Sequence, residues 1–254
     1  MNPEIRRDKI FELVKSKKKA VAEDLCRMFD VTGETIRKDL SILNDRGLII
    51  RTHGGAIFRE DYDPSLAQRT VSNLKEKTAI ARKAAEYVES SDCIILDAGS
   101  TIIELAKLLN ENSNIVVLSN SLEIINILSK RNGFDVISSG GSLMVKSMSF
   151  CGRLAEHSVT IYNIQKAFMS AFGVGFNEGI METNELEASF KRKAIEAAKE
   201  VTVLVDHTKF HKIAHETVCG IKKVNRIITD DRADPEDLKK YEDAGIDVVI
   251  AEIR

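Results

Sequence analysis

The first 45 residues repeat hydrophobic side chains at intervals of three and four, the spacing that places them on one face of a helix. The pattern covers three successive segments, EIRRDKIFELVKS, AVAEDLCRMF and VTGETIRKDLSILND. It therefore predicts three short amphipathic helices. Their buried stripes are expected to be Ile10, Leu13 and Val14, then Val21, Leu25, Met28 and Phe29, and finally Ile36, Leu40 and Leu43.

The third predicted helix has a polar face opposite its buried stripe. Thr32 is expected to be its N-cap, because a threonine hydroxyl can accept a free N–H of the first turn. Gly47 is expected to end it as a C-cap. At 100° per residue, the residues pointing away from the stripe are Glu34, Lys38, Ser41 and Asp45, with Thr35 and Arg37 on the flanks.

The next segment, LIIRTHGGAIF, has the pattern of a short β-hairpin. Residues 48–50 are predicted to form one strand and residues 56–58 the return strand. Gly54 and Gly55 permit the tight turn between them. Such a hairpin is the shape of a wing, and it would place Arg51 and His53 against phosphate or the minor groove.

Helix, helix, tight turn, helix and wing together predict an α+β winged helix-turn-helix domain over residues 1–58. The second helix of the pair enters the major groove, and its first residues contact base edges. The alternative is a small helical domain whose cations are only a solvated surface. The residues expected to contact double-stranded DNA are Thr32, Gly33, Glu34, Thr35, Arg37, Lys38, Arg51 and His53.

The charge distribution agrees with a DNA-binding head. Residues 1–58 hold 12 Lys and Arg against 9 Asp and Glu, although the whole chain has a net charge of −2. A mildly basic head on an acidic body suits a small anion-binding domain ahead of a larger one. The 254 residues and the hydrophobic fraction of 43% are sufficient for two packed cores.

Residues 59–73, REDYDPSLAQRTVSN, are polar and show no sustained period, so they are predicted to be a linker. Residues 74–254 then alternate apolar runs with helical segments. Continuous apolar strands between helices predict an α/β domain with a mostly parallel sheet covered on both faces. The predicted strands are CIILD, NIVVLS, FDVIS, KAFMSA, VTVLVD, VNRIITD and IDVVIA.

Three turns that follow these strands are rich in small and polar residues. In folds of this class, ligands bind at the carboxyl ends of the strands, so the three turns are expected to converge on one crevice. A glycine and two hydroxyls at a helix N-terminus suit an anion. Ordinary capped turns would show the same residue types. The candidates are Asp97, Gly99, Ser100 and Thr101, then Ser119, Asn120 and Ser121, then Gly140 and Gly141.

Two further segments place charges near the ends of strands. ASFKRKAIEAA has three cations on one helix, and LVDHTKF follows another strand. A cation that points into the crevice would pair with a ligand phosphate, although most such cations are solvated. From these segments Lys193, Asp206 and Lys209 are taken as candidates for effector binding.

The stretch VTGETIRKDLSILNDRGLIIRTHGGAI resembles the N-terminal signature of the DeoR family of bacterial transcriptional regulators. The family pattern T-I-R-R-D-L appears here with Lys38 in place of the second arginine, which keeps the charge but loses the bidentate fork. The H-G-G-A wing turn is complete from His53 to Ala56. The resemblance continues through nearly the whole chain.

The resemblance also implies a C-terminal domain similar in fold to ribose-5-phosphate isomerase, which binds phosphorylated sugars or related metabolites as effectors. The family's D-x-G-[ST]-T, T-N-S, G-G and D-x-S-K segments match the candidates named above. Two departures, Met144 after the glycine pair and Gln165 at a usually acidic position, are expected to alter the effector pocket.

We therefore expect a DNA-binding repressor of a carbohydrate-utilisation operon, which is not an enzyme, has no cofactor and forms a homo-oligomer. One alternative is an isomerase-like enzyme with a DNA-binding head. The other is a DNA-binding protein whose body only oligomerises. For the enzyme, the groups that would supply a base and a cation are Asp97, Glu185, Glu187 and Lys193.

The four cysteines are far apart and contain no CxxC pair, which argues against a disulfide framework or a zinc site. The first residues are charged and have no apolar signal core. No stretch approaches the roughly 20 apolar residues of a membrane span. A cytosolic protein with reduced cysteines and no membrane partner is expected.

Overall fold

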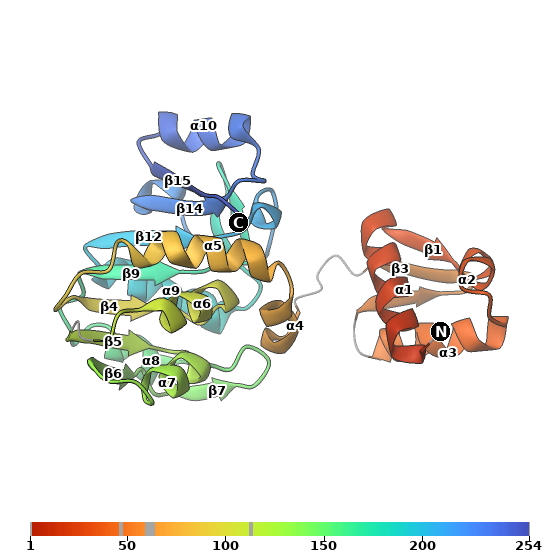
Figure 1. Cartoon of the computed structure of the whole chain (residues 1–254), viewed down its shortest axis with the longest axis horizontal. Helices are drawn as coiled ribbons and strands as arrows, with labels where there is room; N and C mark the ends of the chain where they lie inside the picture. Colours follow the sequence, from red (N-terminus) through yellow and green to blue (C-terminus); the bar gives the residue numbers. More distant parts are fainter. Residues whose placement is uncertain (1, 46–47, 59–63, 112–113, 254) are drawn as a thin grey trace. The chain divides into compact units, whose positions relative to one another are not determined.

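The computed structural model describes residues 2–45, 48–58, 64–111 and 114–253, and it divides the chain into two units, Met1–Asp63 and Pro64–Arg254 (Figure 1). The predicted C-cap Gly47 and the first five residues of the predicted linker lie outside the described residues. None of the helices in the described ranges is long and apolar enough to cross a membrane.

The first unit is a three-helix domain with a small antiparallel sheet in the order β1-β3-β2. Its core gathers the predicted residues Ile10, Val14, Leu25, Ile36 and Leu40. The elements are α1 (Pro3–Lys17), β1 (Lys19–Val21), α2 (Ala22–Phe29), α3 (Gly33–Asp45), β2 (Ile49–Thr52) and β3 (Gly55–Phe58).

The predicted stripe of the second helix is wrong at two positions. Val21 is 48% exposed and Met28 is 54% exposed. Val21 belongs to β1, where it pairs with Gly55. It is therefore part of the sheet and precedes helix α2. A strand of three residues is too short to show a period of its own.

The second unit is built on a parallel sheet of seven strands in the order β15-β14-β12-β9-β4-β5-β6, which confirms the predicted fold class. All seven predicted apolar runs form these strands. They are β4 (Cys93–Leu96), β5 (Ile115–Ser119), β6 (Phe134–Ser138), β9 (Lys166–Met169), β12 (Glu200–Leu204), β14 (Arg226–Asp230) and β15 (Asp247–Ala251).

Helices cover both faces of this sheet (Figure 1). Ile94 and Leu96 pack in one core and Ile95 in the other, which is why the strands read as continuous apolar runs. One face holds α5 (Leu74–Ala85), α6 (Ser100–Leu108) and α7 (Leu122–Leu128). The other holds α8 (Arg153–Ser158), α9 (Glu185–Ala197) and α10 (Pro235–Asp243).

Several smaller elements were not predicted from the sequence. An antiparallel sheet joins β10 (Gly173–Gly175), β11 (Gly179–Glu182) and β13 (Glu216–Cys219), and a hairpin joins β7 (Ser142–Met144) to β8 (Ser149–Cys151). The short 3-10 helices η1 (His207–Lys209) and η2 (Ile221–Lys223) follow β12 and β13.

The predicted linker differs from the structure over residues 64–73. This stretch contains the helix α4 (Leu66–Val71) and belongs to the second unit. Leu66 is buried in the core beside α5 and α6, and Ser65 with Gln68 forms a capping box. A helix of six residues is too short to show a hydrophobic period, so the sequence pattern did not reveal it.

Candidate DNA-binding and effector sites

Helix α3 has an apolar inner face and an exposed polar face. Thr32 is the N-cap, as predicted: its Oγ1 accepts a hydrogen bond from the Thr35 N–H at 3.3 Å. Ile36 is fully buried, whereas Arg37 and Lys38 are exposed and take no ion-pair partner within the described residues. Glu34 is also exposed. The outer face of α3 is therefore open to a partner along its first two turns.

A buried ion pair fixes α3 against α1. Asp39 is 2% exposed and accepts from Arg6 Nε at 2.6 Å and from Arg7 Nη1 at 3.2 Å. Arg7 also pairs with Glu4 at 2.5 Å, and this hydrogen-bonded partner raises its pKa. Arg37 and Lys38 come just before Asp39 in the chain, so the same contact sets the orientation of the exposed face.

The wing forms from β2 and β3 as predicted, but its turn lies at His53 and Gly54, one residue earlier than predicted, because Gly55 pairs with Thr52 in the sheet. The Arg51 N–H donates to Asn44 Oδ1 at 3.0 Å, which joins the wing to the end of α3. A Cβ on Gly55 would come 2.0 Å from the carbonyl oxygen of Ala20, so only glycine allows β3 to approach β1 this closely. The side chains of Arg51 and His53 are exposed.

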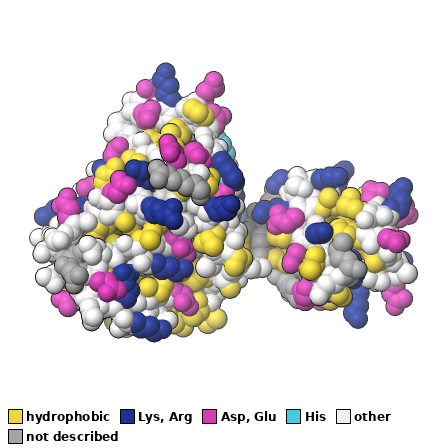
Figure 2. All heavy atoms as spheres, viewed as in Figure 1, with side chains coloured by type: hydrophobic (Ala, Val, Ile, Leu, Met, Phe, Trp, Pro, Cys, Tyr) yellow, Lys and Arg dark blue, Asp and Glu magenta, His cyan; other side chains and the backbone are white. Residues whose placement is uncertain are grey.

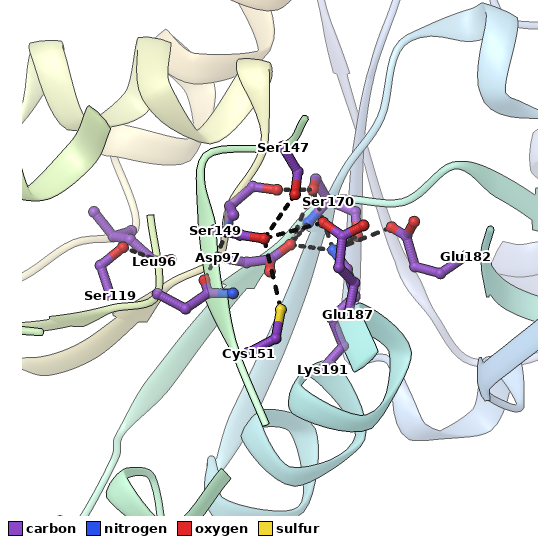
Figure 3. Close-up of polar contacts among 12 residues, drawn as sticks. Leu96, Asp97, Ser119, Ser147, Ser149, Cys151, Ser170, Glu182, Glu187 and Lys191 are labelled. Carbon is purple, nitrogen blue, oxygen red and sulfur yellow. Dashed lines mark hydrogen bonds and ion pairs between the residues drawn. The ribbon is translucent and has the colours of Figure 1, made fainter. Parts of the chain in front are cut away.

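In the second unit, Asp97 follows β4 at the carboxyl edge of the parallel sheet and is 1% exposed. Its Oδ2 accepts from the Ser170 N–H at 3.0 Å and from Ser170 Oγ at 2.9 Å, and it also pairs with Lys191 of α9. Lys191 further pairs with Glu182 at 3.2 Å (Figure 3). Burial lowers the pKa of Lys191, but Asp97 and Glu182 outweigh it and the net pKa is raised.

One oxygen of Asp97 is available for a further contact. Asp97 Oδ1 is buried and has no hydrogen-bond partner among the described residues. Beside it, α6 begins after Gly99 without a side-chain cap, which leaves the first N–H groups of the helix open. A Cβ on Gly99 would lie 2.3 Å from Ser170 Oγ. Ser100 and Thr101 are buried in this turn. The edge thus combines a carboxylate acceptor with helix N–H donors.

A second polar cluster adjoins Lys191. Ser149 of β8 is fully buried, and its Oγ lies 2.8 Å from Ser147 Oγ and donates to Glu187 at 3.2 Å (Figure 3). Burial raises the pKa of Glu182, with Lys191 opposing the shift. Burial also raises the pKa of Cys151, to about 11, so this thiol stays neutral beside Ser149.

The turn after β12 contributes Asp206 and Lys209. Asp206 caps η1 through the Thr208 N–H at 3.0 Å and accepts from Asn73 at 3.4 Å. Burial raises the pKa of Asp206, but Lys209 and the Thr208 hydroxyl outweigh it, and the net pKa is lowered. Burial lowers the pKa of Lys209. This turn therefore brings a buried carboxylate and a half-buried cation to the same strand end.

Two protein-family models match this chain. The DeoR-like helix-turn-helix domain matches residues 6–61, and the DeoR C terminal sensor domain matches residues 72–231. The chain belongs to the DeoR family. It is a DNA-binding transcriptional regulator with a sensor domain for a small-molecule effector.

Similar proteins agree with this assignment. The chain is 36% identical to the uncharacterized HTH-type transcriptional regulator YulB of Bacillus subtilis, over 96% of this chain and 95% of that protein. It is 30% identical to the glycerol-3-phosphate regulon repressor of Escherichia coli, over 89% and 90%. Ribose 5-phosphate isomerase A of Methanocaldococcus jannaschii aligns with a TM-score of 0.42 at 19% identity over 56% of each chain, a likeness too weak to carry an argument.

Several residues that were predicted to bind the effector make contacts that hold the sensor domain together. Ser119 Oγ donates to the Leu96 carbonyl at 2.6 Å, and Ser121 is the N-cap of α7. Asn120 Oδ1 accepts from the Ala98 N–H at 3.0 Å, which joins two neighbouring turns. Gly141 has a φ of +106° and packs on β8. Gly140, with a φ of +65°, has open space beside it.

The choice of Lys193 is corrected by the structure. Lys193 pairs with Glu196 at 2.8 Å on the exposed side of α9, whereas Lys191 reaches Asp97. The helical spacing of residues in α9 could have identified Lys191 from the sequence. Lys191 lies three residues after the buried Ala188 and three before the buried Ala194, so it shares the buried face of α9.

Of the groups considered for an isomerase, Asp97 and Glu187 lie near Lys191 at the strand ends, whereas Glu185 and Lys193 do not join them. Glu185 pairs with Arg192 at 2.5 Å on the surface, and Lys193 lies apart from the strand ends. Gln165 lies before the first residue of β9 and accepts from the Cys93 N–H at 2.6 Å. It is thus at the amino end of the strands, and the expectation that it alters the effector pocket is wrong. Met144 lies in the β7–β8 hairpin opposite Ser149, and its effect stays a prediction.

Proposed function

We propose that this DeoR-family regulator represses a carbohydrate-utilisation operon, and that a phosphorylated sugar or a related metabolite controls its binding to the operator. The observation that carries the effector proposal is the set of buried charges at the carboxyl edge of the sheet. Asp97 pairs with Lys191 at the carboxyl end of β4, and Asp206 is buried at the carboxyl end of β12 in the same sheet, the edge at which ligands bind in parallel sheets. The E. coli relative named for a glycerol-3-phosphate regulon supports an effector of this class.

For DNA, the proposed contacts are the exposed first turns of α3 and the wing. Arg37 and Lys38 would contact phosphate or a base edge, and Arg51 would contact phosphate. Operator half-sites are read by paired heads, so a homo-oligomer is part of the proposal. Binding to a chromosomal operator implies that the protein acts in the cytoplasm. The remaining proposed contacts are Thr32, Gly33, Glu34, Thr35 and His53.

Control by a metabolite requires that the effector bind one conformation of the protein better than another. The alternative in which the second unit only oligomerises predicts no response to any small molecule. An enzyme with a DNA-binding head predicts turnover. A ligand titration and a turnover assay therefore distinguish these two alternatives from an effector-controlled regulator, whereas the fold does not.

The decisive experiment is fluorescence anisotropy with DNA from upstream of the protein's own gene, at fixed salt. The titration is repeated with phosphorylated sugars and polyols and with their unphosphorylated parents. A phosphate ester that shifts the DNA affinity, while its parent compound does not, is the expected result. A DNA affinity that no phosphate ester changes would contradict the proposed control. The sign of the shift says whether the effector releases the protein from the operator or strengthens its binding.

A further inference from the structure

Strand β15 forms one edge of the seven-stranded sheet. It pairs in parallel with β14 from Asp247 to Ala251, and no strand in the described part of the chain pairs with its other side. Exposed sheet edges can pair with another chain and are usually protected by charged side chains or proline. The one charge within β15 is Asp247, which is already paired with Arg226 at 2.6 Å, whereas Ile250 is 48% exposed. This edge therefore lacks the usual protection against a partner.

A hollow of about 450 Å³ lies beside this edge, between β15 and helix α5. Helix α5 packs against β14 and β15 (Figure 1). The lining has an apolar part, which includes the exposed Ile250, and four charged side chains. An apolar centre with a charged rim is typical of protein–protein interfaces. The residues of this α5–β15 face are Ala79, Arg82, Lys83, Glu86, Ile250 and Glu252.

The charges around the hollow are balanced. Arg82 and Lys83 are basic, and Glu86 and Glu252 are acidic. Lys83 pairs with Glu86 at 3.2 Å, whereas Arg82 and Glu252 are exposed and form no ion pair within the described residues. In the region of α5 and β15, Figure 2 shows basic and acidic side chains interspersed with hydrophobic ones. A surface with both signs of charge does not suit a nucleic acid or a strongly charged peptide, which would need one sign.

A mixed surface of this kind fits a second copy of itself. Across a twofold axis both copies use the same surface, so each contact occurs twice. We propose that two copies of this chain pack together through the α5–β15 face. In this dimer Arg82 of each copy pairs with Glu252 of the other, and the two pairs flank the Ile250 side chains. The assignment rests on the homo-oligomer of the proposed function and adds the surface that forms it.

The α5–β15 face lies apart from the candidate effector site. β15 is at the edge of the sheet, whereas Asp97 follows β4, which is four strands away. Helix α5 also packs against α6, whose first turn holds the effector candidates Ser100 and Thr101. The proposed contact therefore leaves the effector site uncovered, and α5 is the element that touches both.

The test is sedimentation velocity of the full-length protein over a range of concentrations, without DNA or effector. Arg82→Glu places two carboxylates opposite each other at both contacts, and Glu252→Arg does the same with two cations. Each change should weaken self-association at least about a hundredfold. Arg153→Glu is the matched control, because Arg153 is an exposed arginine of α8, on the other face of the sheet. This control should associate like the parent.

A mixture of the two variants gives a sharper criterion. When Arg82→Glu meets Glu252→Arg, each facing pair again combines one carboxylate with one cation. The mixture should therefore associate, although neither variant does so alone. The double variant should associate like the parent for the same reason. Circular dichroism checks that each variant is folded.

Three results would overturn the proposed interface. If both folded single variants associate as tightly as an associating parent, the homo-oligomer of the proposed function stands and uses another face. If the single variants dissociate but their mixture and the double variant do not recover, Arg82 and Glu252 do not face each other. A monomeric parent would contradict this interface and the homo-oligomer together. Control of DNA binding by the effector would still be decided by the anisotropy titration.

Discussion

In the described part of the chain, both units hold cations that form no ion pair with a carboxylate, but the surroundings of these cations differ. In the first unit, Arg37 and Lys38 are exposed on α3; in the second, Arg69, Lys77 and Lys209 are buried or half-buried near strand ends. Exposed cations suit a large polyanion that releases counterions when it binds. Enclosed cations suit a small anion that loses its hydration shell when it binds. If both groups bind anions, the same residue types would serve two kinds of ligand, and the two binding events should differ in their dependence on salt.

Both units also hold a buried, paired charge that positions the functional cations. Asp39 holds Arg6 in the first unit, and Lys191 lies between Asp97 and Glu182 in the second. Asp39 lies on α3, which also carries the proposed DNA contacts. Asp97 follows β4 at the edge of the sheet that carries the proposed effector site. Removing one partner of a buried pair should therefore lower the free energy of unfolding. Removing an exposed cation should weaken ligand binding and leave the free energy of unfolding unchanged.

The largest effect is expected from Lys191→Met, which leaves Asp97 and Glu182 buried without their cation. Breaking a buried ion pair in this way should lower the free energy of unfolding by about 3–5 kcal/mol. Lys193→Met removes a neighbouring lysine from an exposed pair and should leave the free energy of unfolding nearly unchanged. Urea denaturation of both variants measures the difference. Equal stability of the two would show that Lys191 does not hold the cluster together.

The pH dependence of the same variant sharpens the comparison. Burial raises the pKa of Glu182 in the folded protein, so its contribution to stability is present at low pH and falls as the pH rises through the folded pKa. Without Lys191, that pKa rises further. The loss of stability in Lys191→Met should therefore be smaller at pH 5 than at pH 8. A loss that is independent of pH between these values would argue that Glu182 is not the group left unpaired.

Asp39→Asn should have the next largest effect, because it leaves the buried Arg6 without its carboxylate. A loss of roughly 3 kcal/mol in the unfolding free energy of the first unit is expected. Asp24→Asn removes the acid of an exposed pair on α2 and is the control, with a change below about 1 kcal/mol. Denaturation followed by a probe in the first unit measures both. If Asp39→Asn were as mild as its control, the contact would not anchor α3 to α1.

Arg37→Ala should leave the stability unchanged and weaken operator binding by about 1–3 kcal/mol, because its cation is exposed and forms no ion pair with any described residue. If Arg37 contacts a phosphate, the slope of log K against log salt should fall by about one. Arg27→Ala, an exposed arginine of α2, is the matched control in the anisotropy assay. Unchanged DNA affinity in Arg37→Ala would place the DNA-binding face elsewhere than on α3.

The smallest effect is expected from Thr101→Val, which removes a buried hydroxyl at the start of α6. Loss of one hydrogen bond of roughly 1 kcal/mol should weaken effector binding about threefold to tenfold while DNA binding without effector stays the same. Comparing the effector concentration for half-maximal release of DNA in parent and variant tests this. An unchanged midpoint would mean that the hydroxyl has only a structural role.

The sequence by itself determined the order of the elements and much of their type. The apolar stripes of α1 and α3, the wing and the seven strands were predicted because each pattern lies within one stretch of chain. The turn from Asp97 to Thr101 was found for the same reason. Elements of three to six residues, such as β1 and α4, were missed because they span too few repeats of the hydrophobic period to identify them.

Only the tertiary structure decided which charges meet. Lys191 joins Asp97 across 94 positions of the chain, and Arg6 joins Asp39 across 33. Local patterns carry no information about such partners, because the contacts arise when α9 packs beside β9 and α1 packs on α3. The same packing leaves Arg69 Nε buried without a hydrogen-bond partner among the described residues, although the Arg69 carbonyl accepts from Lys77. Whether a buried cation meets a carboxylate depends on how distant segments pack, which is a property of the folded chain.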